Sequence, residues 1–200
     1  MNPMNHSMLN HQLFLIKEHI GLFKAANNFD IYDPISGETL MYCREEKLGF
    51  FTKMFRFTKY KMMTPFHVEV RGVNGAPVLS LTRKSSFWGF KSVHVFNEHG
   101  KFIGTMNRKF RIGGAKLELN DAHGNMLGIL KGNFIGWDFK ISNDEQELAI
   151  ITKKWAGIGK ELFTSADNYM LEIHNSVPQN DSIRILMVGA VLCIDFLLKE

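Results

Sequence analysis

The chain has 200 residues, of which 45% are hydrophobic and 22% are charged. This length suffices for one sizeable core and does not require two, so we predict a single domain over residues 1–200, with residues 1–10 flexible. The two cysteines, Cys43 and Cys193, stand far apart and form no CxxC pair, which argues against a disulfide framework and favours a reducing compartment. The first ten residues lack a charged region followed by an apolar one, so we expect no signal peptide and a cytoplasmic location.

The first element is an apolar stretch at residues 8–19, which we predict to be a strand, although a short helix also fits it. Five segments with a shared pattern follow, at residues 29–46, 66–84, 93–109, 117–133 and 139–155. Each opens with alternating apolar residues, reaches a turn and resumes with apolar residues. The last four end on or close to a lysine. Asn74-Gly75, His99-Gly100 and His123-Gly124 mark three of the turns. Alternation predicts strands with one buried face, and glycine lets the chain reverse at positive φ.

Five successive hairpins predict an antiparallel meander, and the absence of a strand–helix–strand alternation argues against a parallel sheet. Ten or more strands in one small domain would leave exposed edges, which closure into a barrel removes. We therefore predict a mainly β fold, a closed antiparallel barrel.

The C-terminal segment, residues 182–198, is expected to form one helix. Asp181 or Ser182 can cap it, and residues 185–194 are apolar on every side, which is typical of a helix that is fully buried or in lipid. The apolar run is about half of the ~20 residues that a bilayer span needs, and Arg184 and Asp195 bound it. We predict that this helix fills the barrel lumen; the alternative is a single-pass membrane segment at residues 183–198.

The segment from residue 47 to residue 66 combines basic and aromatic side chains. We select as candidate lipid or membrane contacts Lys47, Phe50, Phe51, Lys53, Arg56, Lys59 and Lys61. Basic charge attracts anionic headgroups and aromatic rings enter the membrane interface. The same mixture suits single-stranded nucleic acid, which we place second, and part of the run alternates like an ordinary barrel strand.

Catalytic and metal-binding motifs are lacking in the sequence. It contains no GxSxG, HExxH or Walker pattern, and the eight histidines have no metal-ligand spacing. We therefore expect no enzyme and no covalent chemistry.

Two blocks near the end of the chain resemble the phospholipid scramblase family. The first runs Lys154-Trp155-x-Gly157-x-x-x-Glu161-x-Phe163-Thr164-x-Ala166-Asp167-Asn168-Tyr169, and the second runs Gly189-Ala190-x-x-x-Ile194-Asp195-Phe196-x-x-x-Glu200. The resemblance implies a tubby-like barrel of about twelve strands around a buried C-terminal α-helix. It also implies Ca²⁺-dependent movement of phospholipids between leaflets. The family's Pro-rich extension and palmitoylated cysteine cluster have no counterpart here.

The family's proposed calcium loop would correspond to residues 165–176. Asp167 is retained, whereas Ser165 and Ser176 stand where the family has acids, and Glu172 is the other carboxylate in the window. Calcium needs several oxygen ligands, mostly carboxylates. The candidate metal ligands are thus Asp167, Asn168 and Glu172, and we expect Ca²⁺ to bind weakly or not at all.

The expected function is that of a scramblase-like protein that acts on or binds phospholipids at an anionic membrane surface, with possible transbilayer lipid movement. The net charge of +4 is compatible with such a surface. We expect a peripheral association with the membrane. The alternative is a soluble tubby-like adaptor or ligand-binding barrel that shares the fold without scrambling lipid.

Overall fold

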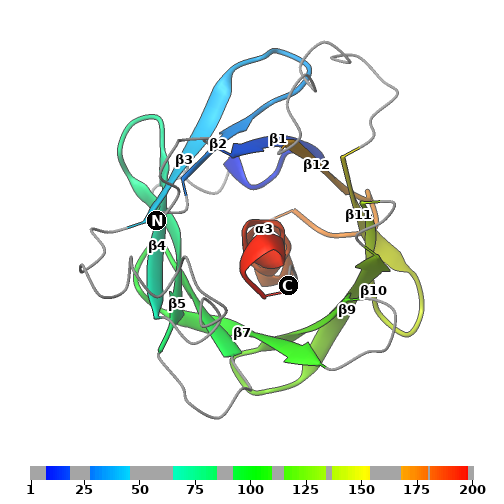
Figure 1. The fold of residues 1–200 in the computed structure, drawn as a ribbon. Coiled ribbons are helices and arrows are strands. Elements are labelled where there is room, and N and C mark those ends of the chain that lie inside the picture. Colours follow the sequence, from blue (N-terminus) through cyan, green and yellow to red (C-terminus); the bar gives the residue numbers. More distant parts are fainter. Residues whose placement is uncertain are drawn as a thin grey trace.

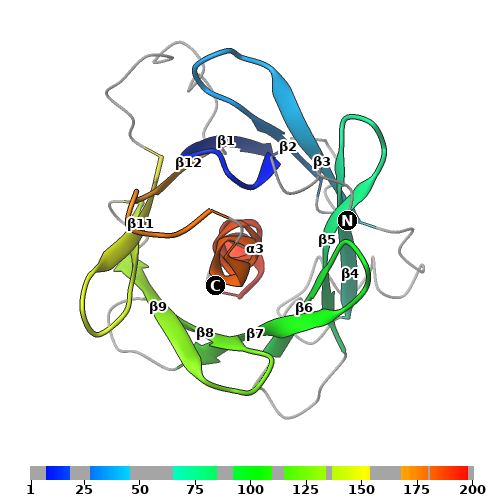
Figure 2. The same ribbon diagram turned by 180° about the vertical axis from the view of Figure 1, so that it is seen from behind.

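A computed structural model describes residues 8–18, 28–45, 65–84, 92–109, 115–133, 137–153, 168–179 and 181–197. Twelve antiparallel strands form a closed barrel, and β1 pairs with β12 to close it (Figures 1 and 2). The strands are β1 Leu13–Glu18, β2 Phe29–Tyr32, β3 Thr39–Glu45, β4 Phe66–Gly72, β5 Pro77–Arg83, β6 Ser92–Asn97, β7 Phe102–Lys109, β8 Ala115–Asp121, β9 Met126–Asn133, β10 Asp138–Ser142, β11 Glu147–Thr152 and β12 Asn168–Ile173. The predicted meander and its closure are confirmed.

Five short turns gather at one end of the barrel, which we call the turn end. Gly75, Gly100 and Gly124 have φ of 80°, 70° and 89°, as the Asn-Gly and His-Gly pairs predicted. The side chain of Asp121 accepts hydrogen bonds from the backbone amides of His123 and Asn125, both at 2.8 Å. We call the opposite end, where β3 and β5 finish and β4 and β6 begin, the distal end.

The C-terminal segment forms α3, Ser182–Leu197, inside the ring of strands (Figure 1). It starts at the turn end, where Asp181 accepts a hydrogen bond from the amide of Ile183 through its side chain (3.0 Å). Sixteen residues rising 1.5 Å each give a helix of about 24 Å, which runs toward the distal end. No helix within the described part of the chain is both long and apolar enough to cross a bilayer.

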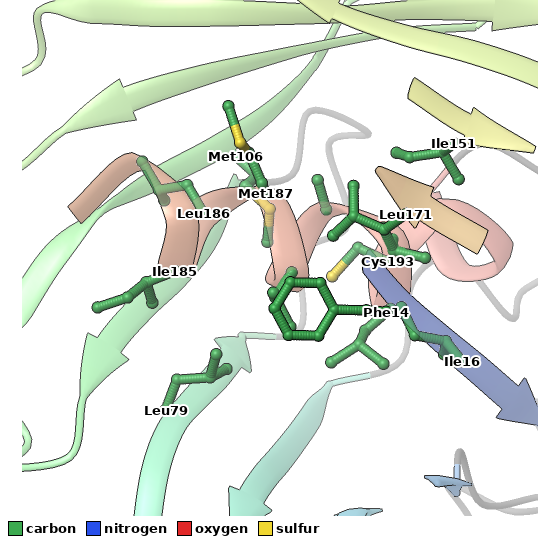
Figure 3. Close-up of a cluster of buried hydrophobic side chains, with 14 of the residues drawn as sticks. Phe14, Ile16, Leu79, Met106, Ile151, Leu171, Ile185, Leu186, Met187 and Cys193 are labelled. Atoms are coloured by element: carbon green, nitrogen blue, oxygen red, sulfur yellow. The ribbon is translucent and has the colours of Figure 1, made fainter. Parts of the chain in front are cut away.

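Inward-facing side chains of the strands pack around α3 and form one core. Phe14, Met106 and Leu171 come from three different strands and surround the helix (Figure 3). Every side chain of α3 from Ile183 to Ile194 that the structure describes is buried. This packing explains why the helix is apolar on every side: each of its faces meets a strand.

Two charged residues in the described part of the chain are buried, Arg83 and Arg184, and Arg184 has no exposed surface. Its guanidinium donates hydrogen bonds to the backbone carbonyl oxygens of Leu9 (2.7 Å), Val177 (3.2 Å) and His11 (2.6 Å). These three bonds join the first turn of α3 to the segment before β1 and to the segment after β12. Burial lowers the pKa of Arg184, an effect that the charge of Asp181 opposes.

Candidate functional site

Most of the residues predicted to contact a membrane or a metal lie outside the described part of the chain. Lys47, Phe50, Phe51, Lys53, Arg56, Lys59 and Lys61 lie outside the described residues, in the segment that joins the end of β3 to the start of β4. Residues 1–7 and Asp167 lie outside them too. Asn168 and Glu172 are described, and both belong to β12.

Asn168 and Glu172 do not converge. They are four positions apart along an extended strand, a distance of about 13 Å. Asn168 is buried opposite Lys17, and Glu172 is half-buried opposite Leu13. No group of three His, Cys, Asp or Glu side chains that could hold a metal occurs within the described ranges. Weak or absent calcium binding stays a prediction.

The outer wall of β3 and β4 carries a hollow of about 390 Å³ that includes Tyr42, Arg44, Glu69 and Arg71 in its lining. Each of the two arginines is already paired. Arg44 lies 2.6 Å from a carboxylate oxygen of Asp30, and Arg71 lies 2.5 Å from one of Glu69. Because these carboxylates neutralise the arginines, the hollow offers little net charge to an anion.

A different arrangement of charge occupies the outer wall of β7 to β10. Lys109, Lys116, Lys131 and Lys140 face one another in register: Lys109 is the partner of Lys116, Lys116 of Lys131, and Lys131 of Lys140. We call these four residues the lysine row. Three steps between neighbouring strands give the row a span of about 14 Å.

Two glutamates neutralise part of the row. Glu118 lies 3.1 Å from the ammonium of Lys109 and 3.4 Å from that of Lys116. Glu147 lies 2.7 Å from the ammonium of Lys140, and this hydrogen bond and charge raise the pKa of Lys140, which keeps it protonated. Lys131 is exposed and has no ion pair or hydrogen bond to any described residue. Asp138, an exposed carboxylate two residues before Lys140 on β10, also raises the pKa of that lysine through its charge. The four lysines and these three carboxylates leave an excess of one positive charge.

The two ends of the barrel differ in charge. The five short turns, residues 33–38, 73–76, 98–101, 122–125 and 143–146, contain five carboxylates and one lysine. The carboxylates are Asp33, Glu38, Glu98, Asp144 and Glu145, and the lysine is Lys101. The lysine row lies nearer the distal end, since Lys109 ends β7 and Lys116 is the second residue of β8. The lysine row is thus separated along the barrel axis from the turn end, which carries most of its charge on carboxylates.

The comparison with protein families decides the assignment of this barrel. A sequence model of the scramblase family matches residues 3–200. The chain belongs to the scramblase family. The resemblance seen in the two C-terminal blocks is thereby confirmed.

A relative and a solved structure are similar to this scramblase-family chain. "Altered inheritance rate of mitochondria protein 25" of Saccharomyces cerevisiae is 22% identical over 200 residues, which is 85% of this chain and 61% of the yeast protein. The chain therefore spans less than two thirds of that relative. An X-ray structure of a protein from Arabidopsis thaliana has a TM-score of 0.55 and 14% identity, with 94% of this chain and 93% of that chain covered. At this identity the likeness shows the fold alone.

Sequence reasoning missed the lysine row. The available signal was a lysine at or near a segment boundary: Lys109 and Lys131 near the ends of two segments, and Lys116 and Lys140 at the starts of two. Which of these lysines align across the sheet depends on the register of four strands. The bulge between Leu119 and Asn120 in the β8–β9 pair shifts that register. Counting residues from each turn would therefore misalign Lys116 and Lys131.

Proposed function

We propose that this scramblase-family chain binds phospholipid at the surface of a membrane, without covalent chemistry. Family membership over residues 3–200 is the observation that carries the proposal. The placement of α3 is consistent with it, because the most apolar segment of the chain packs inside the barrel and a peripheral association needs no spanning helix. The proposed location is the cytoplasmic face of a membrane.

The basic and aromatic segment from Lys47 to Lys61 is one proposed contact with that surface. In the sequence it joins the end of β3 to the start of β4, and both of these strand ends lie at the distal end of the barrel. Its lysines and arginine would attract anionic headgroups, and its phenylalanines would enter the interface.

Sedimentation with vesicles tests the binding proposal. Vesicles of phosphatidylcholine alone and of phosphatidylcholine with phosphatidylserine separate headgroup charge from bilayer contact. We expect sedimentation with the anionic vesicles that weakens as salt is added, because salt screens exposed charges. Combined substitution of Lys53, Arg56 and Lys59 by Glu should abolish it. Equal sedimentation of this variant and the wild type would remove the segment from the proposal.

Transbilayer movement of lipid is the finer proposal. A fluorescent lipid in the inner leaflet of reconstituted vesicles, followed by quenching from outside, measures it directly with and without Ca²⁺. Protein-dependent movement supports scrambling. Binding without movement supports the second candidate, a lipid-binding or adaptor barrel. The observation that favours it is that the described side chains of α3 pack against the inward side chains of the strands.

A further inference from the structure

We propose that the lysine row on β7 to β10 is a docking surface for the anionic face of a phospholipid bilayer. This inference rests on the proposed function and names a part of the wall that binds. Figure 2 shows β7, β8 and β9 as one side of the barrel. Strands β5 and β6 lie between this wall and strand β4 in the barrel. The row and the segment from Lys47 to Lys61 share no residue, so separate variants test the two contacts.

Electrostatic repulsion within the lysine row destabilises the barrel, and the fold does not require it. Like charges directly opposite each other on neighbouring strands are destabilising, and this row has three such pairs in succession. Outward positions of a barrel tolerate many polar residues, so packing does not demand lysine at any of the four. An external anion removes the repulsion, which gives the arrangement a physical use.

The carboxylates beside the row are Glu118, Glu147 and Asp138, one fewer than the four lysines. Glu118 is shared between Lys109 and Lys116, and Glu147 serves Lys140 from the other edge. Lys131 stands between them with its ammonium exposed and unpaired within the described ranges. An anion that approaches the middle of the row meets the uncompensated charge.

The shape of the row favours a bilayer over other polyanions. A line of about 14 Å along the barrel wall presents several ammonium groups at one level, which suits many headgroups in a plane. The outward neighbours of the lysines carry no aromatic ring that could stack a nucleic-acid base; they are Asn107, Glu118, Ile129, Asn133, Asp138 and Ser142. The next position in the row, on β11, is Ile150, a partly exposed apolar side chain.

A pair of double variants of the full chain tests the proposal. Lys131→Gln with Lys140→Gln removes the unpaired and one ion-paired lysine of the row. Lys101→Gln with Arg71→Gln is the matched control, since Lys101 has no ion pair among the described residues and Arg71 is paired with Glu69. Both doubles lower the net charge by two. Partition onto vesicles of phosphatidylcholine with phosphatidylserine is measured for each, with the wild type beside them.

The row double should bind about 25-fold more weakly, at about fivefold for each lysine near an anionic surface. The control should bind like the wild type, and the melting temperature of Lys131→Gln should stay unchanged or rise because a repulsion is relieved. Wild-type binding with an unaffected row double overturns the docking surface and leaves the proposed function standing. Equal losses of binding in both double variants would show that only net charge matters, and this result would overturn the docking surface too.

Two further outcomes also count against the row. A wild-type chain that does not partition onto anionic vesicles at all removes the proposed function and the row with it. Row-dependent binding to a single-stranded oligonucleotide that is tighter than binding to vesicles reassigns the row to nucleic acid.

Discussion

Removal of the Arg184 side chain should destabilise the barrel more than any other single loss of charge in the described part of the chain. Its three hydrogen bonds hold the first turn of α3 against the segments on either side of the β1–β12 seam. Arg184→Met keeps much of the volume but removes the donor from the carbonyl oxygens of Leu9, Val177 and His11, which are buried or partly buried. Each unsatisfied group costs about 1–3 kcal/mol, and the guanidinium no longer has to be desolvated, so the net loss is about 3–5 kcal/mol.

That loss is a large part of the ~5–15 kcal/mol by which a domain is stable. Urea unfolding followed by tryptophan fluorescence measures it, with Arg71→Met as the control. Arg71 is about half exposed and paired with Glu69, so its removal should cost no more than about 1 kcal/mol. The loss in free energy of unfolding for Arg184→Lys should lie between those of Arg184→Met and Arg71→Met, because one ammonium group cannot reach three carbonyl oxygens that lie in different directions. A loss below about 1 kcal/mol for Arg184→Met would refute the idea that these bonds hold the helix.

Three other outcomes follow from the packing and the turns. Gly104→Ala should cost at least about 3 kcal/mol in urea unfolding because its Cβ would overlap a backbone carbonyl of the neighbouring strand, whereas Gly189→Ala, whose Cβ would meet a flexible leucine side chain at 3.1 Å, should cost far less. Burial raises the pKa of the Cys193 thiol to about 12, so a thiol reagent at neutral pH should not modify it until the barrel unfolds; rapid labelling of the native chain would contradict the buried helix. The hydrogen bond from the Asn125 side chain, with the backbone amides, lowers the pKa of Asp121, so this turn loses stabilisation only as pH falls through that lowered pKa. Asn125→Ala should raise the pKa of Asp121 in an NMR titration. An unchanged pKa would show that this hydrogen bond does not lower it.

The barrel and its central helix could be predicted because both depend on local patterns. Alternation in each hairpin segment gives the inward face of a strand, and a helix that is apolar on every side needs a surrounding wall. The positive φ of Gly75, Gly100 and Gly124 follows from the Asn-Gly and His-Gly pairs that lie between alternating apolar segments. These features are set within a few residues of sequence, so they need no knowledge of distant contacts.

The roles of Arg184 and of the lysine row depend on distant contacts. From the sequence, Arg184 is interpreted as a charge that flanks the apolar run and limits a membrane span. Its hydrogen-bond partners Leu9 and His11 lie 175 and 173 residues away in the sequence. A carbonyl group is present at every position, so no residue type marks the partners in advance. The lysine row is likewise spread over four strands, and its alignment follows from pairings that a bulge shifts by one residue.

The central helix also bears on how a chain of this family could move lipid. Eight large apolar side chains of α3 are buried in the lumen, namely Ile183, Ile185, Leu186, Met187, Val188, Val191, Leu192 and Ile194. At about 1.5–3 kcal/mol each, their exposure to water would cost about 12–24 kcal/mol as an upper estimate, which equals or exceeds the ~5–15 kcal/mol by which a domain is stable. A bilayer could accept these side chains, but the strand residues that line the lumen would then face water, and Arg184 would lose its three carbonyl partners. If the proposed lipid binding holds, an intact barrel binds lipid with its outer surface, where the lysine row lies.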